Sequence, residues 1–206
     1  MTSSTSETTT SRMTHDPFPS ENRPAAQNIP SLLLHICCGP CAIHVIELLR
    51  GSYQLAGCFF NPNVQPRDEY FRRLQAAATV CRVQGISVWV PLYDPAPWFA
   101  AIQGNEADPE GGRRCEICFD HRLDAVARLA GLCSFDAFAT TLTISPHKDA
   151  RKINEIGERL ASAYSVSYLA SNFKKQHGFQ TTLRKSKDMG LYRQHYCGCC
   201  FSLSNR

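Results

Sequence analysis

Residues 31–50 read SLLLHICCGPCAIHVIELLR and join a strand pattern to a helix pattern through a short turn. The run at 32–36 is short and apolar apart from His35, which is typical of a buried strand. Cys37-Cys38-Gly39-Pro40 ends this run, and Pro40 can occupy the first turn of a helix that continues to about residue 50. A strand that leads directly into a helix indicates an α/β fold.

The same alternation continues along the chain. Further strands are expected at residues 54–60, 86–91, 135–141 and 166–169. Further helices are expected at residues 66–85, 114–129 and 147–163, the second ending at Gly131 and the third capped by Ser145. This rhythm predicts a mostly parallel, Rossmann-like (HUP-type) sheet with helices on both faces. We expect a single α/β domain over residues 31–206, with a cysteine-rich C-terminal segment.

The first 30 residues differ in composition from the rest. Eleven of them are Ser or Thr, and they lack an apolar segment behind a basic start, so residues 1–30 are predicted to be a disordered tail rather than a secretory signal. The whole chain has 206 residues, 43% hydrophobic and 19% charged, which excludes a fully disordered protein. No apolar run approaches the roughly 18 residues of a membrane-spanning helix. We therefore expect a soluble, cytoplasmic protein without a membrane partner.

Cysteine is the most unusual component of the chain. There are eleven cysteines, an odd number, and no secretion signal, which argues against a secreted disulfide framework. Eight lie in three short clusters: Cys37, Cys38 and Cys41; Cys115 and Cys118; Cys197, Cys199 and Cys200. Clusters of this kind in a reducing compartment indicate metal binding or redox chemistry. The isolated Cys58, Cys81 and Cys133 are expected to be small buried apolar residues.

The first two clusters predict a metal site with four thiolates. Cys37 and Cys38 follow the first strand, at the sheet edge where α/β proteins bind their ligands, and the next helix begins there with a dipole that favours thiolates. Cys115 and Cys118 are three residues apart at a helix start, so both sulfurs lie on one face. This spacing fits zinc and an iron–sulfur cluster equally well.

The third cluster fits a redox couple. A disulfide within Cys-x-Cys closes a very small ring, which is strained and readily reduced, and Gly198 relieves the crowding of its backbone. Additional metal ligands, or free thiols near the chain end, fit the same residues.

A basic segment precedes the third cluster. Between residues 172 and 195 six cations accompany a single acid, Asp188; the cations are Lys174, Lys175, Arg184, Lys185, Lys187 and Arg193. Histidines and aromatic residues are interleaved with them: His177, His195, Phe173, Phe179 and Tyr192. Such a segment fits an RNA backbone with an unstacked base, and it also fits an ordinary solvated basic surface.

Five blocks of the chain resemble the QueH-type epoxyqueuosine reductases. They are LLLHICCGPCA (32–42), FFNPNVQPRDEYFRR (59–73), RRCEICFDHRL (113–123), FATTLTISPHKD (138–149) and LYRQHYCGCCFS (191–202). Together, and in the same order, they cover nearly everything after the N-terminal tail. The resemblance implies an oxidoreductase of tRNA modification that reduces epoxyqueuosine to queuosine at the wobble nucleoside, the last step of queuosine biosynthesis.

The resemblance also implies roles for individual cysteines. A [4Fe–4S] cluster would be held by Cys37, Cys38, Cys115 and Cys118. Cys197 and Cys199 would form a redox-active disulfide, although the additional Cys200 departs from the commoner family pattern and leaves the partner of Cys197 open. The residue that matches Cys41 is a candidate ligand of a further iron or other metal ion.

The implied reaction places further demands on the chain. Removing the epoxide oxygen as water takes two electrons and two protons, and the Cys197/Cys199 dithiol holds two electrons that an external donor must replace. A general acid is also needed; the candidates are His35, Tyr192, His195 and Asp120. The oligomeric state is not indicated by the sequence.

Two other functions fit part of the sequence. A cluster-dependent tRNA-thiolating enzyme of the ATP-pyrophosphatase type shares the predicted sheet, but it needs a Gly/Ser-rich phosphate loop where this chain has CCGPC. A zinc-stabilised RNA-binding module explains the thiolates and the basic segment, but it does not explain a reducible CGC motif.

Overall fold

The computed structural model of the chain describes residues 29–202. The predicted tail at residues 1–30 lies almost entirely outside the described residues, so its boundary remains a prediction. Five parallel strands form one sheet in the order β3-β2-β1-β4-β5. They are β1 (Ser31–His35), β2 (Gln54–Cys58), β3 (Ser87–Trp89), β4 (Ala137–Thr140) and β5 (Ser167–Tyr168). The parallel sheet expected from the sequence is therefore confirmed.

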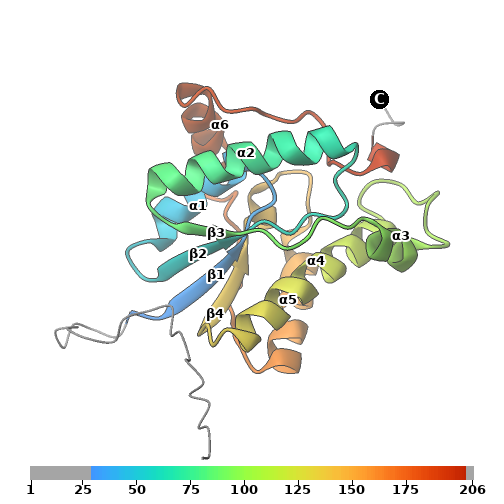
Figure 1. Ribbon diagram of the computed structural model, residues 1–206, viewed down its shortest axis with the longest axis horizontal. Coiled ribbons are helices and arrows are strands. Elements are labelled where there is room, and N and C mark those ends of the chain that lie inside the picture. The colour runs from blue at the N-terminus through green and yellow to red at the C-terminus, as the bar shows by residue number, and fades with distance from the viewer. Residues whose placement is uncertain (1–28, 203–206) are drawn as a thin grey trace, which may run out of the picture.

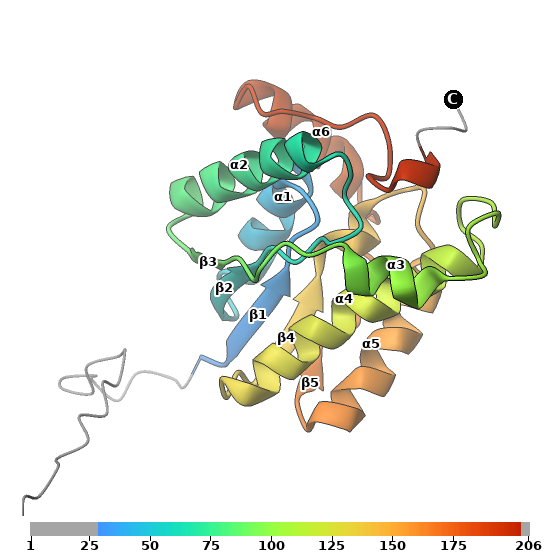
Figure 2. The same cartoon turned by 45° about the vertical axis from the view of Figure 1, so that its right-hand side comes forward.

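Helices cover both faces of this sheet (Figure 1). On one face lie α1 (Gly39–Leu49) and α2 (Arg67–Gln84), with α6 (Gly178–Asp188) packed against α1. On the other face lie α4 (Arg113–Leu132) and α5 (Ala150–Tyr164), and α3 (Ala96–Ile102) packs against α4 (Figure 2). Short 3₁₀ turns occupy Thr141–Ile144 and Cys200–Ser202. Within residues 29–202, none of the helices has the length and apolar character that crossing a bilayer requires.

The central strand divides the core into two layers. Leu32 and Leu34 pack with the residues of α1 and α2, whereas Leu33 packs with those of α4 and α5. This alternation follows from the pleat of a strand, in which successive side chains point to opposite faces. Cys58 and Cys81 are buried in these layers as expected, but Cys133 is exposed because it follows the last turn of α4.

Several element ends differ from the expectation. Helix α4 continues past Gly131 to Leu132. Helix α5 begins at Ala150 and is capped by Asp149, whose carboxylate accepts hydrogen bonds from the backbone N–H groups of Arg151 and Lys152. Ser145 instead accepts a hydrogen bond from the His147 N–H in the preceding loop. Helices α3 and α6 were not predicted, because the first is short and the second was interpreted only as a basic segment.

Candidate functional site

Three cysteines meet at the carboxyl end of the central strand. The sulfurs of Cys37, Cys38 and Cys41 all lie within 4.8 Å of one another. Gly39 allows this arrangement, because a Cβ there would lie 2.5 Å from the backbone carbonyl carbon of Ala76 in α2. The sequence placed these three residues in one cluster, and the family resemblance implied a separate role for Cys41 as a candidate ligand of a further metal; the structure brings all three sulfurs together.

The surroundings of Cys37 favour a thiolate. Hydrogen bonds from the thiols of Cys38 and Cys41, together with the positive charges of Arg122 and Lys148, hold the pKa of Cys37 well below its usual value. The same hydrogen bonding raises the pKa of Cys38 to about 12. Thr141 also holds Cys37 in place. Its hydroxyl accepts a hydrogen bond from the Cys37 N–H at 3.1 Å and donates one to the Cys37 sulfur at 3.3 Å.

Cys115 and Cys118 lie in the first two turns of α4. The Cys115 sulfur accepts a hydrogen bond from the Gly111 N–H at 3.3 Å, and Cys118 is buried against Trp98. Burial raises the pKa of both thiols, that of Cys118 to about 11. Removing bare thiolates from water is unfavourable, so a bound cation would stabilise this pair in its deprotonated form.

Arg122 connects the two cysteine groups. This buried residue lies one helical turn beyond Cys118 and lowers the pKa of Cys37 from across the site. Its guanidinium donates to the Asn61 side-chain oxygen at 2.5 Å, and the Asn61 amide donates to the Ile36 carbonyl at 2.9 Å. No pattern in the sequence indicated a role for Arg122, although its position four residues after Cys118 places it on the same helix face.

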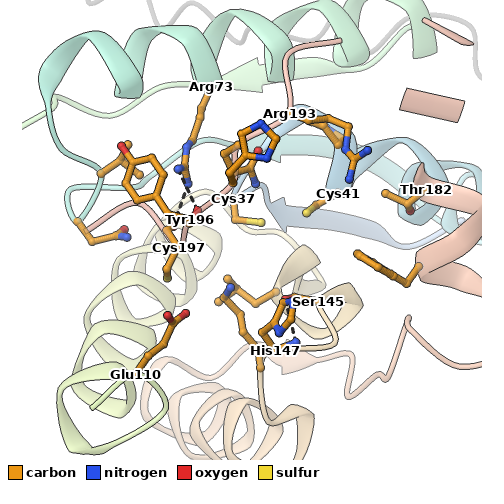
Figure 3. A pocket seen from close by; sticks show the side chains of 18 of the residues that line it. Cys37, Cys41, Arg73, Glu110, Ser145, His147, Thr182, Arg193, Tyr196 and Cys197 are labelled. Carbon is orange, nitrogen blue, oxygen red and sulfur yellow. Dashed lines mark hydrogen bonds between the residues drawn. The ribbon is translucent and has the colours of Figure 1, made fainter. Parts of the chain in front are cut away.

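The C-terminal cysteines reach the same region. Cys197 lines one cavity with Cys37 and Cys41 (Figure 3). Cys199 is buried in a cluster with Cys118. Electrostatic interaction with Cys197 and Cys199 contributes to the raised pKa of Cys115. Cys197 thus lines the cavity with Cys37 and Cys41 and also interacts electrostatically with Cys115 and Cys118, while the four-cysteine ligand set remains a prediction.

Arg73 of α2 holds the segment that carries Cys197. Its guanidinium donates to the carbonyl oxygens of Cys197 at 2.9 Å and Tyr196 at 3.2 Å, and it lies 5.0 Å from the centre of the Tyr196 ring. The buried Glu69 carboxylate accepts from Arg73 at 2.7 Å and from the Tyr192 hydroxyl at 2.5 Å. No feature of the sequence pattern pointed to Arg73.

Gly198 is required by the same packing. It has a φ of +122°, and a Cβ there would lie 2.8 Å from the Arg73 guanidinium. Its carbonyl accepts a hydrogen bond from the Gln65 N–H at 2.8 Å. Glycine between the two cysteines therefore serves both the backbone conformation and the close approach of Arg73.

A cavity of about 490 Å³ opens above the cysteines. Its charged lining consists of Arg73, Arg122, Lys148 and Arg193 against one carboxylate, Glu110. Burial alone would lower the pKa of Lys148, but the nearby Cys197, Cys37 and Cys41 raise it above its usual value. The cavity is therefore strongly cationic, which favours an anionic or electron-rich ligand.

The structure separates the four candidate proton donors. The buried His35 ring bonds to the Thr140 hydroxyl at 2.8 Å and to the Phe60 carbonyl at 3.2 Å, and burial followed by the charge of Arg122 lowers its pKa to about 3. These contacts and the lowered pKa favour the neutral form of His35 and a structural role for it. Asp120 forms an ion pair with Arg159, and Tyr192 donates to Glu69. Of the four, His195 lines the cavity.

The basic segment divides into structural and cavity-facing residues. Lys174 donates to the Lys148 carbonyl at 2.7 Å, and Lys185 forms an ion pair with Glu47 of α1. Arg193 and Phe179 line the cavity instead. Of the cations in this segment, Arg193 alone among the described residues thus lines the cavity beside the cysteines.

Comparison with known proteins gives consistent matches. The family model described as "Epoxyqueuosine reductase QueH" matches residues 32–205. A protein of that name from Streptococcus pyogenes serotype M1 is 38% identical over 182 residues, covering 84% of this chain and 70% of its own length. Its namesake from Thermotoga maritima is 35% identical over 179 residues, covering 85% of this chain and 92% of its own length.

Two solved structures share the fold. The U34-tRNA thiolase NcsA from Methanococcus maripaludis, with its [4Fe-4S] cluster, has a TM-score of 0.56 at 14% identity and covers 85% of this chain and 62% of its own. A predicted subunit of tRNA methyltransferase from Methanocaldococcus jannaschii has a TM-score of 0.51 at 13% identity, covering 76% of each chain. At these identities the likeness concerns the fold alone.

Proposed function

The chain belongs to the epoxyqueuosine reductase QueH family, and on this premise we propose that it reduces epoxyqueuosine to queuosine at the wobble position of a tRNA. One observation beyond family membership supports the proposal: the segments that contain Cys37, Cys118 and Cys197 converge beside a single cationic cavity. A tRNA-thiolating enzyme is not favoured, because the loop after β1 contains cysteines rather than a phosphate-binding glycine run.

The donor set fits a metal cluster. Buried thiols with raised pKa values, beside the low-pKa Cys37, form a site that a cation would stabilise. We assign a [4Fe–4S] cluster to Cys37, Cys38, Cys115 and Cys118, with Cys41 as the ligand of an additional iron or other metal ion. When bound, such a centre supplies electron transfer and Lewis acidity toward the epoxide oxygen.

The protein residues supply electrons and a proton. Cys197 and Cys199 give up two electrons and two protons as they close a disulfide, the epoxide becomes an alkene, and the oxygen leaves as water. An external donor then reduces the disulfide. His195 lines the cavity and is our candidate for delivering the proton to the leaving oxygen.

Metal content and product identity test this proposal together. The protein purified without air is expected to be brown, to contain iron and sulfide, and to convert epoxyqueuosine in tRNA to queuosine when a reductant is added. Mass spectrometry of the nucleosides before and after incubation detects the loss of one oxygen. A colourless zinc protein without conversion, or sulfur incorporation into the tRNA, would contradict it.

Binding of tRNA is expected to depend on Arg193. Replacing this cavity-lining cation by glutamine (Arg193→Gln) removes one phosphate contact, so affinity should fall and the slope of log K against log salt concentration should decrease by about 1. Fluorescence anisotropy at several salt concentrations measures both. Arg128→Gln is the matched control, since this exposed arginine lies about 20 Å along α4 from Cys115; an equal effect of both changes would contradict the assignment.

A further inference from the structure

Two buried polar side chains line the cavity without a protein partner. Asn63 is 1% exposed, and neither its amide nitrogen nor its carbonyl oxygen forms a hydrogen bond within residues 29–202. Thr182 of α6 is 2% exposed, and its hydroxyl also lacks a partner in the described part of the chain. Buried polar atoms are almost always hydrogen-bonded in folded proteins, so we expect these three atoms to form hydrogen bonds to a bound ligand.

The neighbours of Asn63 already hold its loop in place. The Asn61 side chain bridges the Ile36 carbonyl and Arg122, and the Asn61 carbonyl accepts from the Val64 N–H at 3.1 Å. Gln65 donates to the Pro62 carbonyl at 3.0 Å. The side chain of Asn63 is therefore not needed to fix the turn, and it lies preorganised at the cavity wall.

The chemistry of the two side chains defines their ligand. An asparagine amide offers donors and an acceptor together, and a threonine hydroxyl offers both roles. Phosphate, thiolate and sulfide only accept hydrogen bonds and would leave the Asn63 oxygen without a donor. The matching ligand group is neutral and both donates and accepts, as a hydroxyl group does.

Resting on the proposed function, we propose that Asn63 and Thr182 bind the hydroxylated ring of the epoxyqueuosine nucleoside, while the cations of the cavity bind the RNA backbone. Asn63 and Thr182 then recognise the modification itself. Arg193 and Lys148 contribute affinity for any tRNA of the same shape.

The test compares two anticodon stem-loops that differ only in carrying epoxyqueuosine or guanosine at the wobble position. Binding is measured by fluorescence anisotropy with the full-length, anaerobically purified protein in a Cys199→Ser background, which lacks the electron-donating dithiol, so that no turnover occurs. Asn63→Leu is expected to weaken binding of the epoxyqueuosine stem-loop about tenfold, and Thr182→Val several-fold, with guanosine stem-loop binding unchanged. Asn172→Leu is the matched control, because its side-chain oxygen is also buried and unpartnered among the described residues but lies outside the cavity lining.

A thermal melt of the RNA-free protein separates recognition from structure. Asn63→Leu is expected to keep or raise the Tm, because it removes buried polar atoms that have no partner. A lowered Tm with equal loss of binding for both stem-loops would overturn the inference, as would unchanged binding with an altered visible spectrum. If the wild-type protein neither prefers the epoxyqueuosine stem-loop over the guanosine stem-loop nor converts it, the proposed function itself fails. If the wild-type protein does both, and the Asn63 and Thr182 variants keep the preference, only the inference fails.

Discussion

Cys115→Ser is expected to remove the metal cluster and the turnover together, whereas Cys199→Ser is expected to abolish turnover and leave the metal content intact. The difference arises because a serine hydroxyl is a poor replacement for a thiolate ligand at residue 115, while residue 199 is assigned to the electron-donating dithiol. Iron and sulfide analysis, combined with mass spectrometry of the modified nucleoside, measures both properties in the same preparation.

Cys133→Ser provides the control, because this exposed cysteine ends α4 away from the other ten and should tolerate the change in both assays. Full activity of Cys115→Ser would refute its role as a ligand. Full activity of Cys199→Ser combined with an inactive Cys200→Ser would show that Cys200 is the partner of Cys197.

Arg73→Met is expected to lower the free energy of unfolding by about 3–5 kcal/mol, because it leaves the buried Glu69 carboxylate without its cation. The side chains of Arg73 and Glu69 are only 3% and 5% exposed, so solvent cannot replace the lost partner. The variant also loses the hydrogen bonds to the carbonyls of Tyr196 and Cys197, so turnover should fall with stability. Urea denaturation followed by circular dichroism gives the stability change.

The pair Arg151 and Glu155 is the matched comparison. It has the same four-residue separation on a helix, but its side chains are 77% and 63% exposed and the charged atoms are 4.0 Å apart. Arg151→Met should therefore cost less than about 1 kcal/mol. The double change Glu69→Gln with Arg73→Met should recover much of the lost stability without restoring turnover. A small effect of Arg73→Met alone would mean that the buried pair is not required for folding.

The local part of this structure could be predicted from sequence. Short apolar runs and helix periodicity located all five strands and the helices α1, α2, α4 and α5, since these patterns depend on residues close in the chain. Helix α3 is too short for periodicity to show. Helix α6 is rich in charged residues that obscured its packing against α1.

The site could be predicted only where the residue types themselves indicated the chemistry. Clustered cysteines indicated metal binding and redox chemistry, and the parallel sheet placed the first cluster at its carboxyl edge. The role of Arg73 could not be predicted, because its partner Cys197 is 124 residues away in the sequence. Arg73 also contacts Cys197 through a backbone carbonyl, which every residue type has. The side chain of Asn63 lacks a hydrogen-bond partner among the described residues, and this likewise depends on how segments far apart in the chain pack together.

The contact between Arg73 and the carbonyl oxygens at 196 and 197 has a consequence for repeated turnover. Main-chain oxygens keep the same charge and shape whether the neighbouring sulfur is a thiol, a thiolate or part of a disulfide. The two hydrogen bonds from Arg73 therefore do not require a particular oxidation state of the Cys197 sulfur in the proposed redox cycle.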